Sequence, residues 1–161
     1  MRINIIMATG PGGLIGAEGR LPWLIPQDLN RFRELTMGHA VVMGRDTYRS
    51  LGMLRLPGRD NVVISRRPVS TVGLMHFTSL DKGIEWCRLK GNSQCFLIGG
   101  VKIFQHGFKV ADRMYITQVE SKHVRPHAPT KLRYMKLPEE GWSLTESEKA
   151  DGITYEIWDR V

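Results

Sequence analysis

Cysteine is scarce in this chain of 161 residues, and the two that occur form no metal or redox motif. Cys87 and Cys95 lack the C-x-x-C spacing, and no histidine is paired with them. His123 and His127 stand four residues apart, but without a helical context they are typical of surface residues. We therefore predict two buried thiols and no metal site.

Long apolar runs are also absent, since none approaches the roughly 20 residues that a membrane-spanning helix needs. The apolar run at residues 1–6 is too short for a signal peptide and indicates a first strand. Apolar residues make up 42% of the chain and charged residues 24%, as in an ordinary globular protein. We expect one cytoplasmic domain over residues 1–161, long enough to bury a core without disulfides or metals.

Acidic residues are outnumbered, with 16 Asp and Glu against 23 Lys and Arg and a formal net charge of +7. This excess favours anionic partners, either nucleic acids or small molecules that carry phosphates or carboxylates. The basic residues are scattered along the chain, which contains no helix-turn-helix, zinc spacing or aromatic RNA-binding pattern. The charge alone does not choose between these partners.

Short apolar runs alternate with segments of helical periodicity. Strands are predicted at residues 3–8, 39–44, 61–66, 74–78, 94–98 and 112–119. Helices are predicted at residues 26–37, 45–51, 79–89 and 101–107, with Ser79 as the cap of the third. Residues 121–135 read as a long loop, and Ala150-Asp151-Gly152 is a hairpin signal between residues 142–149 and 153–161. The predicted fold class is α/β, a single domain with a mainly parallel central sheet flanked by helices on both faces and a C-terminal antiparallel hairpin.

Asp28 stands beside a predicted apolar stripe, where an ionised carboxylate is energetically unfavourable. Pro26 suits the first turn of a helix, so Asp28 lies in that turn and Phe32 lies one turn above it. Burial beside an apolar stripe raises the pKa of a carboxyl, whereas the helix dipole lowers it. Arg31 and Arg33 point to other faces of a helical wheel. Two interpretations stay open, a first-turn acid that supports the helix start and a carboxylate whose partner is a ligand.

Three predicted strand ends carry groups suited to an anion. Gly44, Arg45 and Thr47 stand where a strand passes into a helix, so backbone N–H groups, a guanidinium and a hydroxyl converge. Arg66-Arg67 closes the next strand, and Gly99-Gly100 forms another corner between a strand and a helix. The alternatives are a solvated basic turn and a tight packing corner. In parallel sheets ligands bind at the carboxyl ends of strands, where these groups lie.

The glycine-rich stretch after the first strand does not complete a dinucleotide-binding fingerprint. After Gly10 and Gly12 the third glycine would fall at position 15, which is Ile, and no helical pattern follows. Residues 14–21 form a glycine-interrupted segment that leads to Pro22-Trp23. Such a segment is either a mobile lid over a site or a plain connecting loop.

Taken in series, these motifs resemble the dihydrofolate reductase family in order and approximate spacing, over essentially the whole chain. They are Pro22-Trp23, Asp28 with Phe32, the stretch MGRDTYRSL at 43–51, Leu56-Pro57-Gly58-Arg59, Ile98-Gly99-Gly100 and Tyr115-Ile116-Thr117. The resemblance implies reduction of 7,8-dihydrofolate to tetrahydrofolate with hydride from NADPH, in support of one-carbon and thymidylate metabolism. It also implies binding of antifolates such as trimethoprim or methotrexate, no nucleic-acid or membrane partner, and a monomer.

The resemblance implies roles for residues around the substrate. Asp28 would hold the pteridine with support from Thr117, while Leu21 and Trp23 would flank the path of a proton carried by water. Arg59 would pair with the carboxylate of the substrate's glutamate tail. The other substrate-binding residues implied are those that would line the pocket: Ile6, Met7, Ala8, Leu29, Phe32, Leu51, Leu56 and Ile98.

It implies a second set of residues around NADPH. Arg45, Thr47 and Gly99-Gly100 would take the phosphates, and Ser65 and Arg66 would meet the 2′-phosphate that separates NADPH from NADH. The other cofactor-binding residues implied are Ala8, Ile15, Gly16, Gly44, Asp46, Ile98, Val101, Ile103 and Phe104.

Two residues depart from the family's pattern. Phe104 stands where many relatives have a tyrosine near the nicotinamide, and Asp46 stands where bacterial relatives often have His or Lys. The pyrimidine reductase of riboflavin synthesis resembles the same fold, but Pro22-Trp23 and Asp28 better suit a flat pterin with an amidine edge. A basic nucleic-acid-binding domain and a catalytically silent folate-binding protein are the alternatives from other classes.

Overall fold

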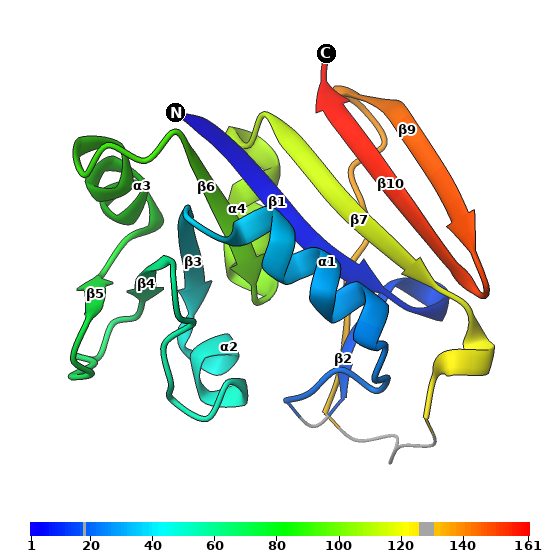
Figure 1. Ribbon diagram of the computed structural model, residues 1–161, viewed down its shortest axis with the longest axis horizontal. Coiled ribbons are helices and arrows are strands. Elements are labelled where there is room, and N and C mark those ends of the chain that lie inside the picture. Colours follow the sequence, from blue (N-terminus) through cyan, green and yellow to red (C-terminus); the bar gives the residue numbers. More distant parts are fainter. Residues whose placement is uncertain (18, 126–130) are drawn as a thin grey trace.

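One eight-stranded sheet forms the framework of the protein, whose computed structural model describes residues 1–17, 19–125 and 131–161 (Figure 1). Its strand order is β5-β4-β3-β6-β1-β7-β10-β9. Strands from β5 through β7 in this order run parallel, and the β9–β10 hairpin joins β7 in antiparallel fashion. The strands are β1 (Arg2–Thr9), β3 (Ala40–Gly44), β4 (Asp60–Ile64), β5 (Leu74–Phe77), β6 (Gln94–Gly99), β7 (Arg113–Val119), β9 (Trp142–Ala150) and β10 (Ile153–Arg160). The predicted fold class is confirmed.

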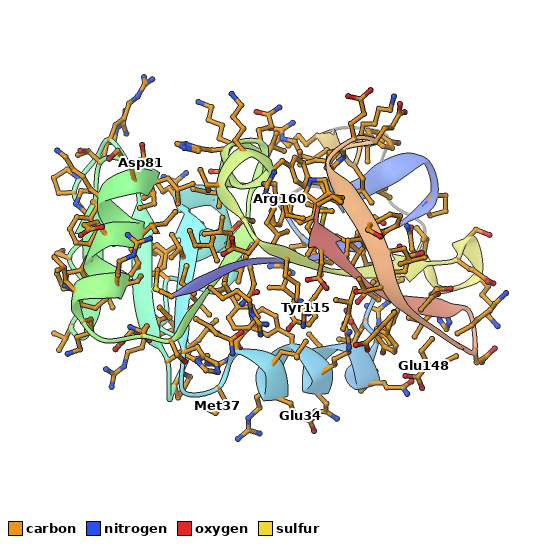
Figure 2. All side chains as sticks on the ribbon, turned by 90° about the horizontal axis from the view of Figure 1, so that it is seen from above. Glu34, Met37, Asp81, Tyr115, Glu148 and Arg160 are labelled. Carbon is orange, nitrogen blue, oxygen red and sulfur yellow. The ribbon has the colours of Figure 1, made fainter. Side chains whose placement is uncertain are left out.

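Four α-helices of the described chain cover both faces of this sheet. They are α1 (Pro26–Thr36), α2 (Arg45–Ser50), α3 (Leu80–Leu89) and α4 (Val101–Val110). Figure 2 shows α1, with Glu34 along it and Met37 at its end, on one side of the sheet and α4 on the other. The predicted cap is confirmed, because the Lys82 backbone N–H donates to Ser79 Oγ at 3.3 Å.

Alternation along the strands divides the core into two faces. On β1, Ile5 and Met7 pack into the cluster beneath α3 and α4, whereas Ile6 and Ala8 face α1. The face beneath α3 and α4 is closed, and each side chain buried there contributes about 1.5–3 kcal/mol. The face toward α1 keeps a row of half-buried apolar side chains, Ile6, Leu35, Leu51, Leu56 and Ile98. This side of the core is therefore less completely buried than the side beneath α3 and α4.

The segment expected to be a lid or a loop begins as a strand. β2 (Leu14–Ala17) pairs antiparallel with β8 (Leu132–Tyr134), which lies inside the stretch expected to be a long loop. Short 3-10 turns occupy Pro11–Gly13 and Ser121–His123. The loop prediction was wrong at β2 and β8 because strands this short show no periodicity of their own. Glu18 and His127 lie outside the described residues.

Both cysteines are buried free thiols, as predicted, and burial raises the pKa of each thiol to about 12. Within the described ranges, no group of three His, Cys, Asp or Glu side chains is arranged to hold a metal ion. In the same ranges, no helix is both long and apolar enough to cross a membrane.

Candidate active site

Asp28 links α1 to the sheet. It lies in the first turn of the helix, as predicted, and its backbone N–H donates to the Ile25 carbonyl at 3.0 Å. Thr117 on β7 is 3% exposed and donates its hydroxyl to Asp28 Oδ1 at 2.8 Å. The pairing of these two residues, which the family resemblance implied, is therefore a direct contact.

The balance between burial and stabilising contacts at the Asp28 carboxyl favours the binding of a ligand. Burial raises its pKa and outweighs two opposing effects, the hydrogen bond from Thr117 and the positive charge of Arg31. Arg31 was expected to point elsewhere, and that expectation missed its electrostatic effect on Asp28. A half-buried carboxyl whose protein partners do not offset its desolvation is typical of a functional site. It suits a ligand edge with two N–H donors.

Trp23 is tightly packed. It is buried in a cluster with Leu14, Ile25 and Tyr155, and a Cβ atom at Gly10 would lie 2.9 Å from its Cζ3 atom. Its Nε1–H group is buried and has no hydrogen-bond partner among the described residues. Such a donor needs a water or a ligand as its partner. Leu21, the other residue expected beside the proton path, is 47% exposed.

The residues expected to line the substrate pocket separate into two groups. Ile6, Leu51, Leu56 and Ile98 gather on the cluster that contains Phe96 and Tyr115. Figure 2 shows Tyr115 between the sheet and α1.

The other four expected lining residues lie differently. The side chain of Met7 packs on the opposite face of the sheet, so only its backbone can border a ligand beneath α1. Ala8 packs in the Trp23 cluster. Leu29 is 51% exposed, while Phe32 is half-buried one turn beyond Asp28.

Arg59 provides a cation beside the C-terminal end of α1. Its Nη1 donates to Thr36 Oγ1 at 3.1 Å and its Nε donates to the Pro57 carbonyl at 3.0 Å. Burial and the neighbouring charge of Arg33 lower the pKa of its guanidinium. In the described part of the chain no carboxylate forms an ion pair with Arg59, which makes it suitable for an external carboxylate.

The two glycine corners expected to bind phosphates lie side by side. Parallel pairing of β3 with β6 brings Met43 opposite Gly99. A Cβ atom on Gly44 would lie 3.6 Å from Gly100 N, and one on Gly99, where φ is 125°, would lie 3.1 Å from Thr47 Oγ1. Any side chain at these glycines would fill the corner from which α2 and α4 begin. The corner therefore fits a pyrophosphate.

The remaining cofactor candidates surround this corner. Ser65 and Arg66 follow β4, the neighbour of β3, and Ser65 Oγ accepts from the Arg67 N–H at 3.2 Å. Ile103 and Phe104 are buried beneath the corner. Ile103 Cγ1 is 3.5 Å from a Cβ atom built on Gly44, and the Phe104 ring is 3.3 Å from one built on Gly99.

Five more candidates complete this set, and one of them, Arg45, is the first residue of α2. Ile15 packs against the same cluster as Phe104. Gly16, on β2, is buried. Asp46 is exposed in the first turn of α2, and Val101 begins α4.

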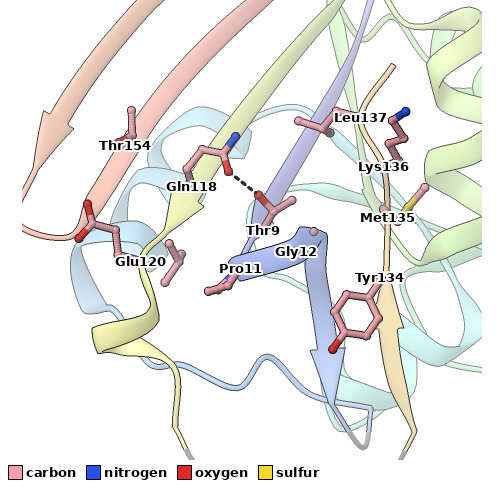
Figure 3. Close-up of a pocket in the computed structure, with 13 residues that line it drawn as sticks. Thr9, Pro11, Gly12, Gln118, Glu120, Tyr134, Met135, Lys136, Leu137 and Thr154 are labelled. Carbon is pink, nitrogen blue, oxygen red and sulfur yellow. Dashed lines mark hydrogen bonds between the residues drawn. The ribbon is translucent and has the colours of Figure 1, made fainter. Parts of the chain in front are cut away.

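A cavity of about 800 Å³ lies away from Asp28, on the other face of the sheet (Figure 3). Thr9, Gln118 and Thr154 line it, and each is the chain neighbour of a residue that faces α1. Thr9 Oγ1 donates to Gln118 Oε1 at 3.0 Å. None of the predicted site residues lines this cavity.

Sequence reasoning missed two neighbours of Asp28. The Arg31 guanidinium lies over the Tyr155 ring, with Cζ 4.5 Å from the ring centroid, and Tyr155 pairs across from Thr117 in the β7–β10 register. Alternation along β10 could have grouped Tyr155 with Ile157 on one face. The sequence offers no signal that this face would meet Asp28.

Comparisons with known proteins agree with this arrangement. The sequence profile of the dihydrofolate reductase family matches residues 2–156. The chain is 34% identical over 148 residues to the dihydrofolate reductase of Bacillus subtilis, an alignment covering 91% of this chain and 83% of that protein. It is 40% identical over 122 residues to that of Mycobacterium leprae, covering 74% and 73%.

A solved structure shares the fold. The dihydrofolate reductase from Enterococcus faecalis complexed with NADP(H) and RAB-propyl aligns with a TM-score of 0.85 at 24% identity, covering 99% of this chain and 96% of that one. These comparisons give no support to the pyrimidine reductase, the nucleic-acid-binding domain or the silent folate-binding protein.

Proposed function

The chain belongs to the dihydrofolate reductase family and reduces 7,8-dihydrofolate to 5,6,7,8-tetrahydrofolate with NADPH, and we propose that this reaction takes place between α1 and the sheet, beside Asp28. The observation that carries the location is the Asp28 carboxyl, whose pKa burial raises although Thr117 donates to it. A pterin offers a ring nitrogen and an amino group to such a carboxylate.

Asp28 orients the pterin and favours its protonated form by electrostatic attraction. Trp23 and Leu21 border the route by which water brings the proton, and the unpartnered Nε1–H of Trp23 supports a water position there. The half-buried row of Ile6, Leu51 and Ile98 contacts the apolar body of the substrate and excludes other water from it.

Arg59 pairs with the carboxylate of the glutamate tail. The support is its lack of an ion-pair partner in the described chain and the second cation, Arg33, beside it. Two neighbouring guanidinium groups repel each other, and a bound carboxylate relieves that repulsion. Arg59 thus selects substrates that carry an acidic tail.

The glycine corner holds the cofactor. NADPH, when bound, supplies the hydride. Gly44 and Gly99-Gly100 leave space for its pyrophosphate, to which Thr47 offers a hydroxyl. Ser65 and Arg66 bind the 2′-phosphate and so favour NADPH over NADH. The corner and Asp28 together align the two rings.

The test is the loss of NADPH absorbance with dihydrofolate, measured beside NADH and with the Asp28→Asn variant. We expect NADPH to be preferred and the single-turnover hydride-transfer rate of Asp28→Asn to fall by about 10²–10⁴-fold, because the variant removes the charge. NADPH affinity should change little. Asp81→Asn, at a 75% exposed side chain on α3, is the matched control and should keep the full rate. An undiminished rate in Asp28→Asn would remove Asp28 from the mechanism.

We propose as well that trimethoprim and methotrexate bind beside Asp28. Both inhibitors present an edge of nitrogen donors that a carboxylate binds in bidentate fashion. Both should therefore lose affinity in Asp28→Asn.

We also propose that the protein acts as a monomer in the cytoplasm. Sedimentation equilibrium tests its oligomeric state, and cell fractionation tests its location.

A further inference from the structure

Tyr155 carries a buried hydroxyl that the proposed mechanism does not use. The side chain is 9% exposed, and its Oη atom is buried without a hydrogen-bond partner in the described part of the chain. Leaving a buried hydroxyl unpaired costs free energy, so such a group calls for an explanation.

The strand register brings Tyr155 next to Asp28. Tyr155 on β10 lies directly across from Thr117 on β7, so the two side chains project from the same face of the sheet. Thr117 in turn donates to Asp28 Oδ1 at 2.8 Å. Tyr155 is therefore the direct cross-strand neighbour of Thr117, the residue that donates to the Asp28 carboxylate.

Arg31 completes the group from the side of the helix. Its guanidinium Cζ lies 4.5 Å from the centroid of the Tyr155 ring and 5.8 Å from that of Tyr115. A cation over the face of a phenol ring is attracted to it and makes its hydroxyl a better donor. Tyr155 thus fixes the position of Arg31, whose charge lowers the pKa of Asp28.

Tyr155 also borders a cavity of about 340 Å³ between α1 and the β9–β10 hairpin. Arg31, Glu146, Ser147, Glu148 and Ile157 form the rest of its lining. Among the described residues, the charged groups around Tyr155 are Arg31 and Asp28 from α1 and the two glutamates from β9. The cavity has polar walls and brings solvent to one side of the Tyr155 side chain, whose Oη atom itself stays buried.

We propose that Tyr155 is a positioning residue for the reduction, whose hydroxyl donates through a water molecule to the Asp28 carboxylate and, with Arg31, keeps that carboxylate ionised and directed at the pterin. The inference rests on the proposed role of Asp28. Burial and the negative charge of Asp28 raise the pKa of Tyr155, so its hydroxyl remains protonated and able to donate. A donor stabilises the charged form of a carboxyl, so its removal raises the pKa of Asp28.

Tyr155→Phe tests this directly, because it removes the hydroxyl and keeps the ring on which Arg31 lies. The ¹³C carboxyl resonance of Asp28, assigned by its loss in Asp28→Asn, should titrate about half a pH unit higher than in the wild-type protein. The acid limb of the kcat profile should move in the same direction while KM for NADPH stays constant. Tyr134→Phe, which removes a hydroxyl from an exposed ring on β8, is the matched control and should shift neither.

An unchanged Asp28 titration in Tyr155→Phe would overturn the proposal. If the variant does not fold, the ¹³Cζ resonance of Tyr155 in the wild-type protein replaces it. That resonance should respond to the ionisation of Asp28 and lose the response in Asp28→Asn, and its absence would equally overturn the proposal. The titrations need no turnover, so they are independent of the test of the proposed function, in which Asp28→Asn is assayed for hydride transfer.

Discussion

The two faces of the central sheet differ in how completely they bury their side chains. Leu97 and Ile98 are neighbours on β6, yet Leu97 is 0% exposed beneath α3 and α4 whereas Ile98 is only half-buried toward α1. Adjacent positions of one strand thus serve different purposes. The face beneath α3 and α4 stabilises the fold. The face toward α1 buries its side chains less completely, so a ligand can cover them.

Two aspartates show the same division. Asp159 accepts two hydrogen bonds from Arg113, at 2.7 and 3.0 Å, and these lower the pKa of its carboxyl. Among the described residues, a single side chain, the Thr117 hydroxyl, donates to Asp28, and burial raises the pKa of the Asp28 carboxyl. The protein satisfies the carboxylate that joins β7 to β10 and leaves the one on α1 for an external partner.

The largest expected effect is a loss of stability on the face of the sheet beneath α3 and α4. Leu97→Ala should lower the free energy of unfolding by about 2–5 kcal/mol, because it leaves a cavity in a fully buried cluster. Ile98→Ala is the matched variant on the other face, where we expect a smaller loss of stability together with a raised KM for dihydrofolate. Urea unfolding and steady-state kinetics measure both. Equal losses of stability would show that the two faces do not differ.

A smaller effect is expected at the ligand-facing cation. Arg59→Gln should weaken dihydrofolate binding by about 10–100-fold, since a charged hydrogen bond contributes roughly 1.5–3 kcal/mol. Binding of a pterin without a glutamate tail should be unaffected, and this comparison, made by fluorescence quenching, is the control. An equal loss for both ligands would contradict the assignment of Arg59 to the tail.

Asp159→Asn should destabilise the fold by about 1 kcal/mol at neutral pH, because it removes the charge from a partly exposed ion pair. The folded pKa of Asp159 is depressed, so its contribution is present above the unfolded pKa of 3.8 and is lost as the pH falls through the folded value. Thermal unfolding of both proteins from pH 7 to pH 2 checks this. The difference should vanish at the acid end and shrink in high salt.

The smallest predicted effect is a gain in stability, in contrast to the losses above, and it concerns Asp28. The folded pKa of Asp28 is raised, so its carboxylate costs stability above that pKa, and the cost disappears as the pH falls below the unfolded value of 3.8. Asp28→Asn should therefore raise the melting temperature slightly at pH 7 and leave it unchanged at pH 3. A lower melting temperature at pH 7 would mean that the protein, and not a ligand, satisfies this carboxylate.

The sequence by itself determined the local structure and the family. Pro26 marked the start of α1, Ser79 capped α3, and Asp151-Gly152 marked the β9–β10 turn, because each acts through neighbours a few residues away. The motifs in series also indicated the family, and through it the pairing of Asp28 with Thr117.

Only the tertiary structure decided which distant segments meet. It paired β2 with β8, turned the side chain of Met7 away from the expected pocket, and brought Tyr155 and Arg31 to the carboxyl of Asp28. The register between β7 and β10 depends on burying one face of each strand against the rest of the core. That packing involves residues from the whole chain, so no local pattern records it.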